Sequence, residues 1–250
     1  MHAACLVLTS LLCAGCTSLD VVTQAGYSSL TVGGDVSLAA DDGSLRGAQA
    51  VGSAFGLGSE RGAPFVRGAV DVGWLAAAAA FTRLQESGTG RLQGDFGGLP
   101  ASTPVQADLE LGLTKLTATV PFAFGPLRLA PGLQLDVLDL EFTAQETATG
   151  NREEIDDALF LPLLHVRGEL TLGPVCIGLD LGALDTPTID DASATVLDVE
   201  LLVEWSVLAQ GHVFAGYRHL EFDAAGTSGD DRLAVDLDLT GWTLGFGLRF

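Results

Sequence analysis

From Phe65 to the C-terminus the chain repeats one plan, in which a stretch of alternating apolar and polar residues is followed by a turn or a polar segment. Alternation with a period of two residues is typical of β-strands that have one apolar and one polar face. No stretch shows a convincing 3.6-residue apolar period over the length of a helix. The pattern predicts an all-β fold with eight strands, at residues 65–85, 104–122, 127–145, 156–171, 174–183, 195–208, 212–223 and 232–250.

The connections between the predicted strands alternate between short and long. FGPL at 124–127 and LGPV at 172–175 are turn-like, whereas ETATGNREEID at 146–156 and LDTPTIDDASA at 184–194 are long and polar. Transmembrane β-barrels of the bacterial outer membrane have this asymmetry, with tight periplasmic turns, longer outer loops and an even number of strands. The sequence therefore predicts an antiparallel up-and-down transmembrane β-barrel with both termini on the periplasmic side.

Each predicted strand has one charged face and one apolar face, as where Leu197 and Val199 alternate with Asp198 and Glu200. The strands are long enough to span a bilayer, so we expect the apolar face to meet lipid and the charged face to line the lumen. An eight-stranded lumen is barely wider than its own side chains, so these charges must pair or be hydrated. The predicted lumen charge network consists of Arg67, Asp71, Asp108, Glu110, Arg128, Asp136, His165, Arg167, Glu169, Asp198, Glu200, Glu204, Arg218, Asp236, Asp238 and Arg249.

The chain ends in GWTLGFGLRF, with a large apolar residue at every second position and a terminal phenylalanine. This ending resembles the C-terminal β-signal by which the barrel assembly machinery recognises outer-membrane barrels. The resemblance assigns that signal to Trp242, Leu244, Phe246, Leu248 and Phe250. Together with FAGYRHLEF at 214–222, it makes residues 65–250 similar to the small outer-membrane barrels of the OmpA, OmpX and OmpW type. The implied protein is a monomer in the outer membrane, in contact with lipid and lipopolysaccharide.

The N-terminal MHAACLVLTSLLCAGC resembles the signal peptide of a bacterial lipoprotein. Its apolar run is too short to span a bilayer as a helix, and CAGC resembles the lipobox that precedes a lipidated cysteine. The resemblance implies that residues 1–15 are removed and that Cys16 is lipidated, whereas the alternative is an ordinary signal peptide cleaved nearby. Past Cys16 the chain has a single cysteine, Cys176, so no internal disulfide is expected.

Residues 16–64 are predicted to link the lipidated end to a barrel at 65–250. Alternatively, SLTVGGDVSLA and GAQAVGSAFGLG within this segment form two further strands, which gives a barrel of ten. The alternation also changes phase near Val137–Leu138 and near Leu239–Gly241, and Pro162 falls inside a predicted strand. We expect β-bulges at these points.

The composition is strongly acidic, with 32 Asp and Glu against 12 Lys and Arg and a formal net charge of -20. Such a balance argues against nucleic acid as a partner. His165, His212 and His219 have no serine and acid partner at a recognisable spacing, so no catalytic site is predicted. The acidic clusters in the long segments could gather Ca²⁺ or Mg²⁺ but match no ordered metal-binding loop, so no metal or other cofactor is predicted, and solvated, cation-bridged loops beside lipopolysaccharide are expected.

These observations together predict an outer-membrane barrel with a structural or surface-interaction role and a lumen filled by charged side chains. Alternation alone leaves two other functions open. One is a narrow channel for small solutes or ions, lined by the same carboxylates. The other is a lipid-anchored soluble carrier of the lipocalin type, which would bury the apolar face instead of exposing it.

Overall fold

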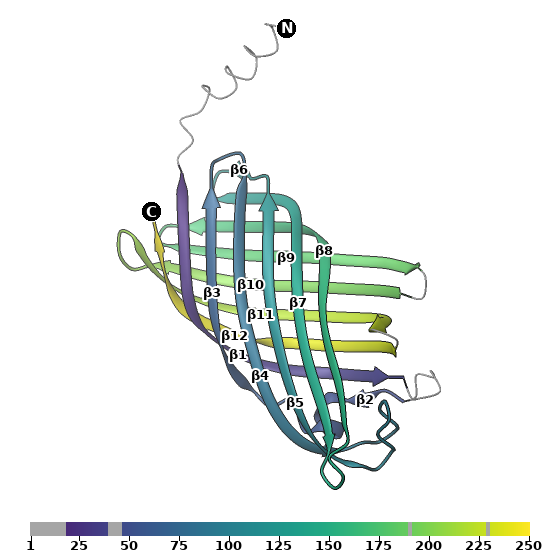
Figure 1. Cartoon of the computed structure of the whole chain (residues 1–250). Helices are drawn as coiled ribbons and strands as arrows, with labels where there is room; N and C mark the ends of the chain where they lie inside the picture. Colours follow the sequence, from purple (N-terminus) through teal and green to yellow (C-terminus); the bar gives the residue numbers. More distant parts are fainter. Residues whose placement is uncertain (1–18, 40–46, 190–191, 229–230) are drawn as a thin grey trace, which may run out of the picture.

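The computed structural model describes residues 19–39, 47–189, 192–228 and 231–250, so the predicted signal peptide and Cys16 lie outside the described residues. Of the twelve strands in its one antiparallel sheet, ten form a closed ring in which each pairs with the next and the last pairs with the first (Figure 1). The ring strands are β1 Asp20–Leu38, β3 Arg61–Asp71, β4 Ala76–Arg91, β5 Pro104–Thr119, β7 Leu127–Glu146, β8 Arg152–Leu172, β9 Val175–Ile189, β10 Ala192–Ser206, β11 Gly211–Ser228 and β12 Asp231–Arg249.

Three short elements accompany the ring. Strand β6, Phe122–Phe124, pairs with the start of β7. Strand β2, Gln49–Ala50, pairs with β1 and leads into the short helix α2, Val51–Phe55. No helix among the described residues is long and apolar enough to cross a membrane.

The predicted antiparallel up-and-down barrel is confirmed, but the ring has ten strands, as in the alternative prediction, and not eight. The single strand predicted at 65–85 is a hairpin of β3 and β4. Its turn is closed by a bond from the Val72 N–H to the Leu75 carbonyl at 2.9 Å. Gly73 has a φ of 84° and donates its N–H to Asp71 Oδ1 at 2.6 Å, which explains why the chain turns here.

The other added strand is β1, which contains SLTVGGDVSLA and pairs with β12 and β3 over most of its length. The barrel therefore begins at Asp20, and the linker predicted for residues 16–64 is wrong from that point on. The proposed partner strand, GAQAVGSAFGLG, is also wrong as a ring strand. Strand β2 pairs only with Asp35 and Val36 of β1, and the chain then forms α2 inside the barrel.

The alternation of apolar and polar residues reverses its polarity along the strands, and in β7 and β12 it does so without a slip in register. In β12, the outward side chains are apolar from Trp242 to Leu248, whereas the inward ones are apolar from Leu233 to Leu239. Pairing of β12 with β1 runs unbroken from Arg249 to Leu233. The bulge expected near Leu239 is therefore absent, and β7 likewise pairs with β5 and β8 without a shift near Val137.

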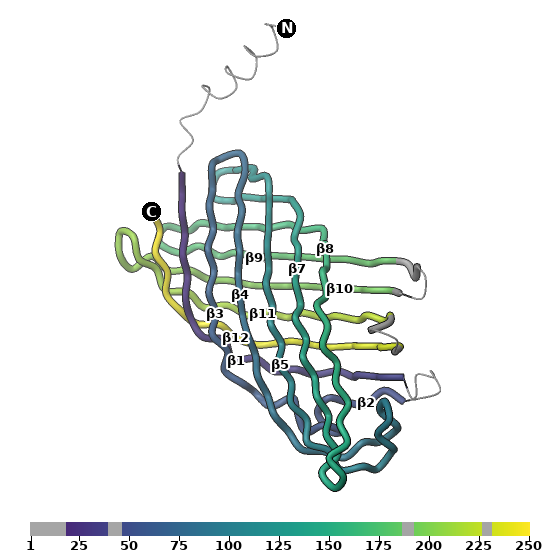
Figure 2. The backbone as a smooth tube through the Cα atoms, in the orientation of Figure 1, coloured from purple at the N-terminus to yellow at the C-terminus, as the bar shows by residue number. Residues whose placement is uncertain are grey.

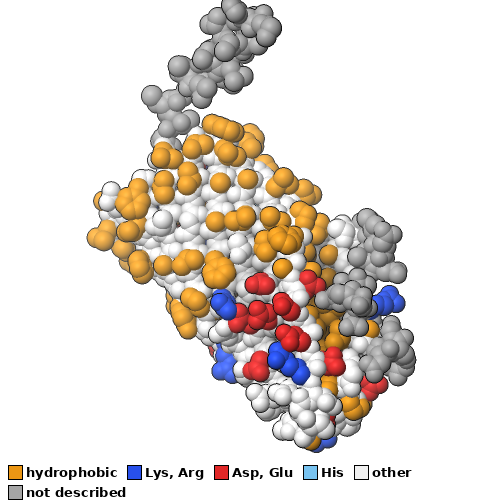
Figure 3. Space-filling model, in the orientation of Figure 1, with side chains coloured by type: hydrophobic (Ala, Val, Ile, Leu, Met, Phe, Trp, Pro, Cys, Tyr) orange, Lys and Arg blue, Asp and Glu red, His pale blue; other side chains and the backbone are white. Residues whose placement is uncertain are grey.

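This reversal divides the barrel into two halves. In the half that holds the start of β1 and the C-terminus (Figure 2), the outward side chains form an apolar band (Figure 3), which on β12 covers 242–250. A span of about nine to eleven residues crosses a bilayer. Tyr27 and Trp242 lie at one edge of the band and Trp74 and Phe250 lie at the other, as in the aromatic girdles of outer-membrane barrels. We call this the membrane half, and the other the water-exposed half.

The polar segments predicted as long loops are largely extensions of strands in the water-exposed half. Strand β7 continues to Glu146, β8 starts at Arg152, and β11 reaches Ser228 before β12 begins at Asp231. Their outward side chains are charged, as Figure 3 shows, because this face meets water and not lipid. In transmembrane barrels the longer segments that project beyond the membrane lie on the outer side, so we assign the water-exposed half to the cell surface.

The interior of the water-exposed half is an apolar core between two facing parts of the sheet, one made of β4, β5, β7 and β8 and the other of β9 to β12 with β1. Phe55 of α2 packs edge-on against Phe142, with ring centroids 4.8 Å apart, and against Phe96. Gly88 lets β4 approach this helix, because a Cβ there would lie 2.4 Å from the Gly56 carbonyl oxygen. The core therefore fills the lumen beyond the membrane half.

The residues of the predicted assembly signal face outward in the apolar band, and Phe250 belongs to the seam that closes the ring. Its N–H donates to the Val21 carbonyl at 2.9 Å, and the Val21 N–H donates to the Phe250 carbonyl at 3.0 Å. The last residue thus continues the pairing of β12 with β1. Recognition of this ending by the assembly machinery stays a prediction.

Candidate functional site

The polar interior of the membrane half is organised around Asp198 of β10, which is fully buried. Arg218 of β11 donates to both its carboxylate oxygens, from Nε at 2.9 Å and from Nη2 at 3.0 Å. Lys115 Nζ of β5 lies 2.9 Å from Oδ2, and Gln134 Nε2 of β7 donates to the same oxygen at 2.8 Å. A bidentate guanidinium and two further donors give Asp198 the full set of partners that a buried carboxylate needs.

A second cluster surrounds Asp180 of β9, one level nearer the periplasmic end. Arg167 Nη1 donates to Asp180 Oδ2 at 2.8 Å, and Arg67 Nη2 lies 3.7 Å from the same oxygen. Arg167 also donates from Nε to Glu169 at 2.7 Å, and Glu169 is bridged to Asp71 by Arg128. The cluster links β3, β7, β8 and β9 across the lumen.

Below this level, the lumen opens into a cavity of about 230 Å³ at the periplasmic end, lined by Asp20, Gln24, Glu204, Arg249 and other polar residues. Gln24 Nε2 donates to Glu204 Oε1 at 2.7 Å and lies 3.1 Å from His212 Nε2. Arg249 lies at the rim and reaches Glu204 at 3.5 Å. Seen from the periplasm, the lumen is a polar vestibule that ends at the buried charge clusters.

Most of the predicted lumen residues lie inside the membrane half, but Asp108, Glu110, Asp236 and Asp238 do not. They face outward in the water-exposed half, so their placement in the lumen network is wrong. The prediction assumed that one face of a strand stays charged and inward along its whole length. Because the polarity reverses, acidic residues beyond the apolar band share the outward face with the lipid-contacting residues.

Sequence reasoning also missed members of the network, notably Lys115, Gln134 and Asp180. Lys115 follows Leu111 and Leu113 on one face of β5, and the prediction took that face to meet lipid. Strict alternation keeps Lys115 on the same face as these leucines, and a lysine is costly on a lipid-facing surface, which indicates that this face points inward. The sequence therefore did contain a sign of the inward face, because the only lysine of the chain follows the two leucines at the next alternate position.

The outward acidic residues of the water-exposed half stand opposite one another across neighbouring strands. Asp236 of β12 pairs in register with Asp223 on one side and Asp35 on the other. The same arrangement joins Glu110, Glu141 and Asp156 across β5, β7 and β8. We call these two sets of three the acidic rows. Like charges directly opposite in a sheet are destabilising, so the rows favour a bound cation between them.

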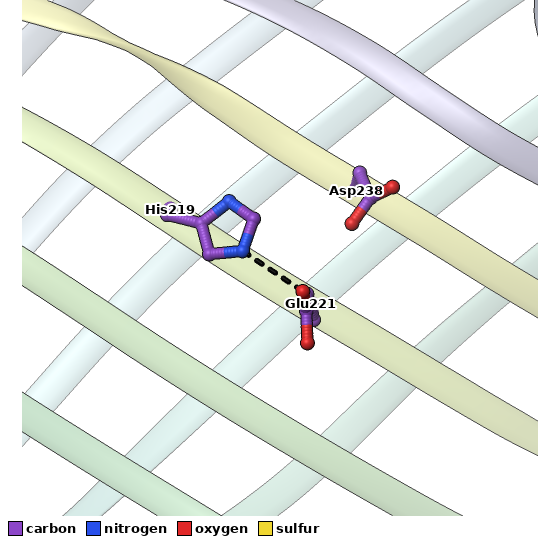
Figure 4. A group of neighbouring side chains, drawn as sticks. All are labelled: His219, Glu221 and Asp238. Atoms are coloured by element: carbon purple, nitrogen blue, oxygen red, sulfur yellow. Dashed lines mark hydrogen bonds and ion pairs between the residues drawn. The ribbon is translucent and has the colours of Figure 1, made fainter.

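One group beside the first row has the composition of a metal site. His219, Glu221 and Asp238 each offer a ligand atom, and these atoms lie within 4.8 Å of one another on the outer face of β11 and β12 (Figure 4). His219 Nε2 lies 3.0 Å from Glu221 Oε1, and Glu221 pairs in register with Asp238. No metal was predicted from the sequence, because these residues meet only through the register of two strands.

The crowded carboxylates of the first acidic row change the pKa of Asp236. Partial burial and the neighbouring Asp223, Asp238 and Asp35 raise the pKa of Asp236 above its ordinary value of 3.8. The folded protein therefore holds this proton more tightly than the unfolded chain does. The stability that this proton contributes is complete below the ordinary pKa and is lost as the pH rises through the raised pKa.

We expect Asp236→Asn to raise the free energy of unfolding at neutral pH and to have no such effect below the ordinary aspartate pKa. Urea unfolding of the protein in lipid vesicles, repeated across this pH range, measures the difference. Asp139→Asn is the matched control, because Asp139 also faces outward but pairs in register with Gly112 and Ala158. Equal effects of the two substitutions would show that the acidic row is not repulsive.

No protein-family model matches the sequence, and no curated protein matches it. Solved structures do resemble it. The outer membrane protease OmpT from Escherichia coli aligns over 92% of this chain and 96% of its own, with 9% identity and a TM-score of 0.56. Weaker likenesses include Ail of Yersinia pestis, with 11% identity over 93% of this chain and 99% of its own and a TM-score of 0.41. The translocator domain of NalP from Neisseria meningitidis has 15% identity over 98% and 92%, with a TM-score of 0.44.

The ring of strands, the apolar band and the likeness to OmpT define the fold: this chain has the fold of a bacterial outer-membrane β-barrel protein. The predicted similarity to small outer-membrane barrels is thereby confirmed at the level of the fold. At 9% identity the likeness to OmpT shows the fold and carries no activity over to this chain.

Proposed function

We propose that this barrel is a surface-interaction protein whose acidic rows bind the phosphate-bearing part of the lipopolysaccharide layer through divalent cations. The observation that carries the proposal is the register of the rows, which puts Asp35, Asp223 and Asp236 directly opposite one another. Among the described residues, no lysine or arginine forms an ion pair with these three. Divalent cations prefer carboxylate oxygens, and phosphate groups supply the remaining ligands.

The height of the rows on the barrel supports the same partner. Asp238 and Trp242 lie close together on the outward face of β12, so the acidic surface begins where the apolar band ends. Head groups of the outer leaflet lie at this level of an outer-membrane barrel. A protein with a net charge of -20 would be repelled by a phosphate-rich layer unless cations lay between them.

The interior supports a surface role over the two alternatives. Apolar packing fills the lumen of the water-exposed half, whereas a channel for ions needs a polar path. A soluble lipocalin-like carrier would bury the side chains that form the apolar band. A role without catalysis is part of the proposal, since His165, His212 and His219 lie at separate places, in the Asp180 cluster, in the periplasmic vestibule and on the outer face.

The test compares thermal unfolding in lipopolysaccharide-containing vesicles with unfolding in phospholipid vesicles, with Mg²⁺ and with a chelator. We expect Mg²⁺ to raise the melting temperature of the protein more when lipopolysaccharide is present. The variant Asp35→Asn/Asp223→Asn/Asp236→Asn, which removes the carboxylates of the first row, should reduce this extra stabilisation, whereas Asp139→Asn should keep it. Equal stabilisation by Mg²⁺ in both kinds of vesicle would contradict the proposal.

A further inference from the structure

The pairing of β8 with β9 stops partway along the two strands, and beyond that point an opening separates them in the wall of the barrel. Their pairing ends at Leu164 and Ala183, although β8 stays paired with β7 back to Arg152. Strand β9 stays paired with β10 out to Ile189. Figure 1 shows the strands up to β8 turning away from β9 and its successors. We call this opening the β8–β9 seam.

A comparable divergence between β3 and β4 is covered from within. Pairing of β3 with β4 ends at Phe65 and Thr82, and there β2 and α2 pack against β1 and β4. At the β8–β9 seam, Pro162 lies two residues from the end of the pairing and has no N–H to offer a neighbouring strand. The side chains beside it remain open, with Leu164 74% and Phe160 67% exposed.

The seam forms the floor of an apolar groove of about 670 Å³ on the side of the barrel. Volumes of this size are usual for small-molecule sites. Its walls include Leu116, Leu133, Pro162, Leu164 and Leu184, from β5, β7, β8 and β9. Several of these side chains belong to the apolar band, so the groove is continuous with the surface that meets lipid hydrocarbon.

Buried polar atoms without partners lie at the same place. Gln134 lines the groove and is 2% exposed, and its Oε1 accepts no hydrogen bond. His165 pairs in register with Gly182, one step before the pairing ends, and its buried Nδ1 also lacks a partner. Gly182 leaves space there, because a Cβ on it would lie 2.9 Å from Gln134 Oε1. Unsatisfied buried polar atoms are costly, so their presence at a seam points to a ligand.

We propose that the β8–β9 seam binds a single-chain lipid alcohol from the outer leaflet, with its hydrocarbon chain in the groove and its hydroxyl on Gln134 Oε1. The occupant comes from the membrane because the groove opens into the apolar band. A hydroxyl both donates and accepts, which suits the carbonyl oxygen of Gln134 and the ring of His165.

The charges nearby select against an anionic head group. The amide nitrogen of Gln134 already donates to Asp136 at 2.9 Å and to Asp198 at 2.8 Å, so two carboxylates lie just behind the acceptor. A fatty acid carboxylate would bring a third negative charge and has no proton to donate to Oε1. The site therefore prefers the alcohol to the acid of the same chain length.

The experiment uses the full-length protein in phospholipid vesicles and a photoreactive hexadecanol whose reactive group is in the chain. We expect saturable labelling of the peptides that contain residues 152–164 and 183–189, displaced by unlabelled hexadecanol. Hexadecanoate should displace the probe much less effectively. Gln134→Leu should weaken binding about tenfold, as expected for the loss of one hydrogen bond in a buried site. Gln145→Leu, at an exposed position of β7, should leave binding unchanged.

Labelling that never saturates and spreads over the whole apolar band would overturn the proposal, because it would show only partition into the lipid boundary. Equal displacement by the acid and the alcohol would overturn the head-group assignment. Gln134 also donates a hydrogen bond to Asp198, so Gln134→Leu can impair folding. A second measurement, on the wild-type protein, keeps the proposal testable in that case. Hexadecanol should shift the ring nitrogen resonances of His165 in the wild-type protein, and unchanged resonances at saturation count against the site. Neither result depends on the proposed binding of lipopolysaccharide.

Discussion

Replacing Asp198 by alanine is expected to lower the free energy of unfolding by about 3–5 kcal/mol, the usual cost of breaking a buried ion pair by removing one partner. Asp198 is the shared acceptor of Arg218, Lys115 and Gln134. Its loss removes the carboxylate paired with Arg218 and leaves Lys115 with Glu200, 3.4 Å from its Nζ, so two cations buried in the membrane half lose their shared partner. Urea unfolding of the barrel in lipid vesicles measures the change.

Glu110→Ala is the control for this prediction, since it removes a carboxylate that pairs with an arginine on the outer surface. Glu110 accepts from Arg83, whose side chain is 52% exposed, and exposed pairs of this kind contribute about 0–1 kcal/mol. The substitution also relieves repulsion from Glu141, which stands opposite in register. An Asp198→Ala variant that unfolds at the same urea concentration as the wild type would mean that the buried cluster does not stabilise the barrel.

The alternation of residue types was enough to predict the fold class and most strand positions, because a period of two is a local property of the chain. The strand count failed where the local signal is weak. Ala76–Ala80 has no polar residue to mark a face, and the turn before it depends on Gly73 and the side chain of Asp71. The sequence therefore predicted one strand at 65–85 where the structure has two, because the apolar residues after the turn give no local sign of it.

The assignment of faces failed for a different physical reason. Alternation shows that two faces differ, but which of them is apolar depends on what each face touches. On β5, Leu113 faces the apolar core and Lys115 faces the buried charges, although both point inward. The position of the membrane boundary is a property of the whole barrel, and no local pattern states it.

The candidate sites were missed because they depend on how strands are paired. Glu221 and Asp238 meet through the register of β11 and β12, and Gln134 reaches the seam only because the pairing of β8 with β9 stops at Leu164. The residues were visible in the sequence, but their neighbours were not. A proline inside a strand was the one local sign of the seam, and it was interpreted as a bulge.

Arginine introduced at two positions on the outer face of β10 is expected to have opposite effects. Leu201 lies in the middle of the apolar band on this strand, where an arginine facing lipid costs about 2–4 kcal/mol near the bilayer midplane. Thr195 faces outward on the same strand, but it stands between Asp223 of β11 and Asp185 of β9. An opposite charge directly across a sheet contributes about 0.2–1 kcal/mol, so Thr195→Arg should stabilise the barrel.

Urea unfolding in lipid vesicles separates these outcomes, and each variant serves as the control for the other because residue type, face and strand are the same. If the outward face met lipid along the whole strand, both substitutions would destabilise the protein. If the outward face of β10 met water throughout, Leu201→Arg would cost little. A loss at Leu201 combined with a gain at Thr195 requires the membrane boundary to cross β10 between the two residues. That boundary also separates the buried charges from the apolar core, because lipid outside allows polar packing inside, whereas water outside requires an apolar interior.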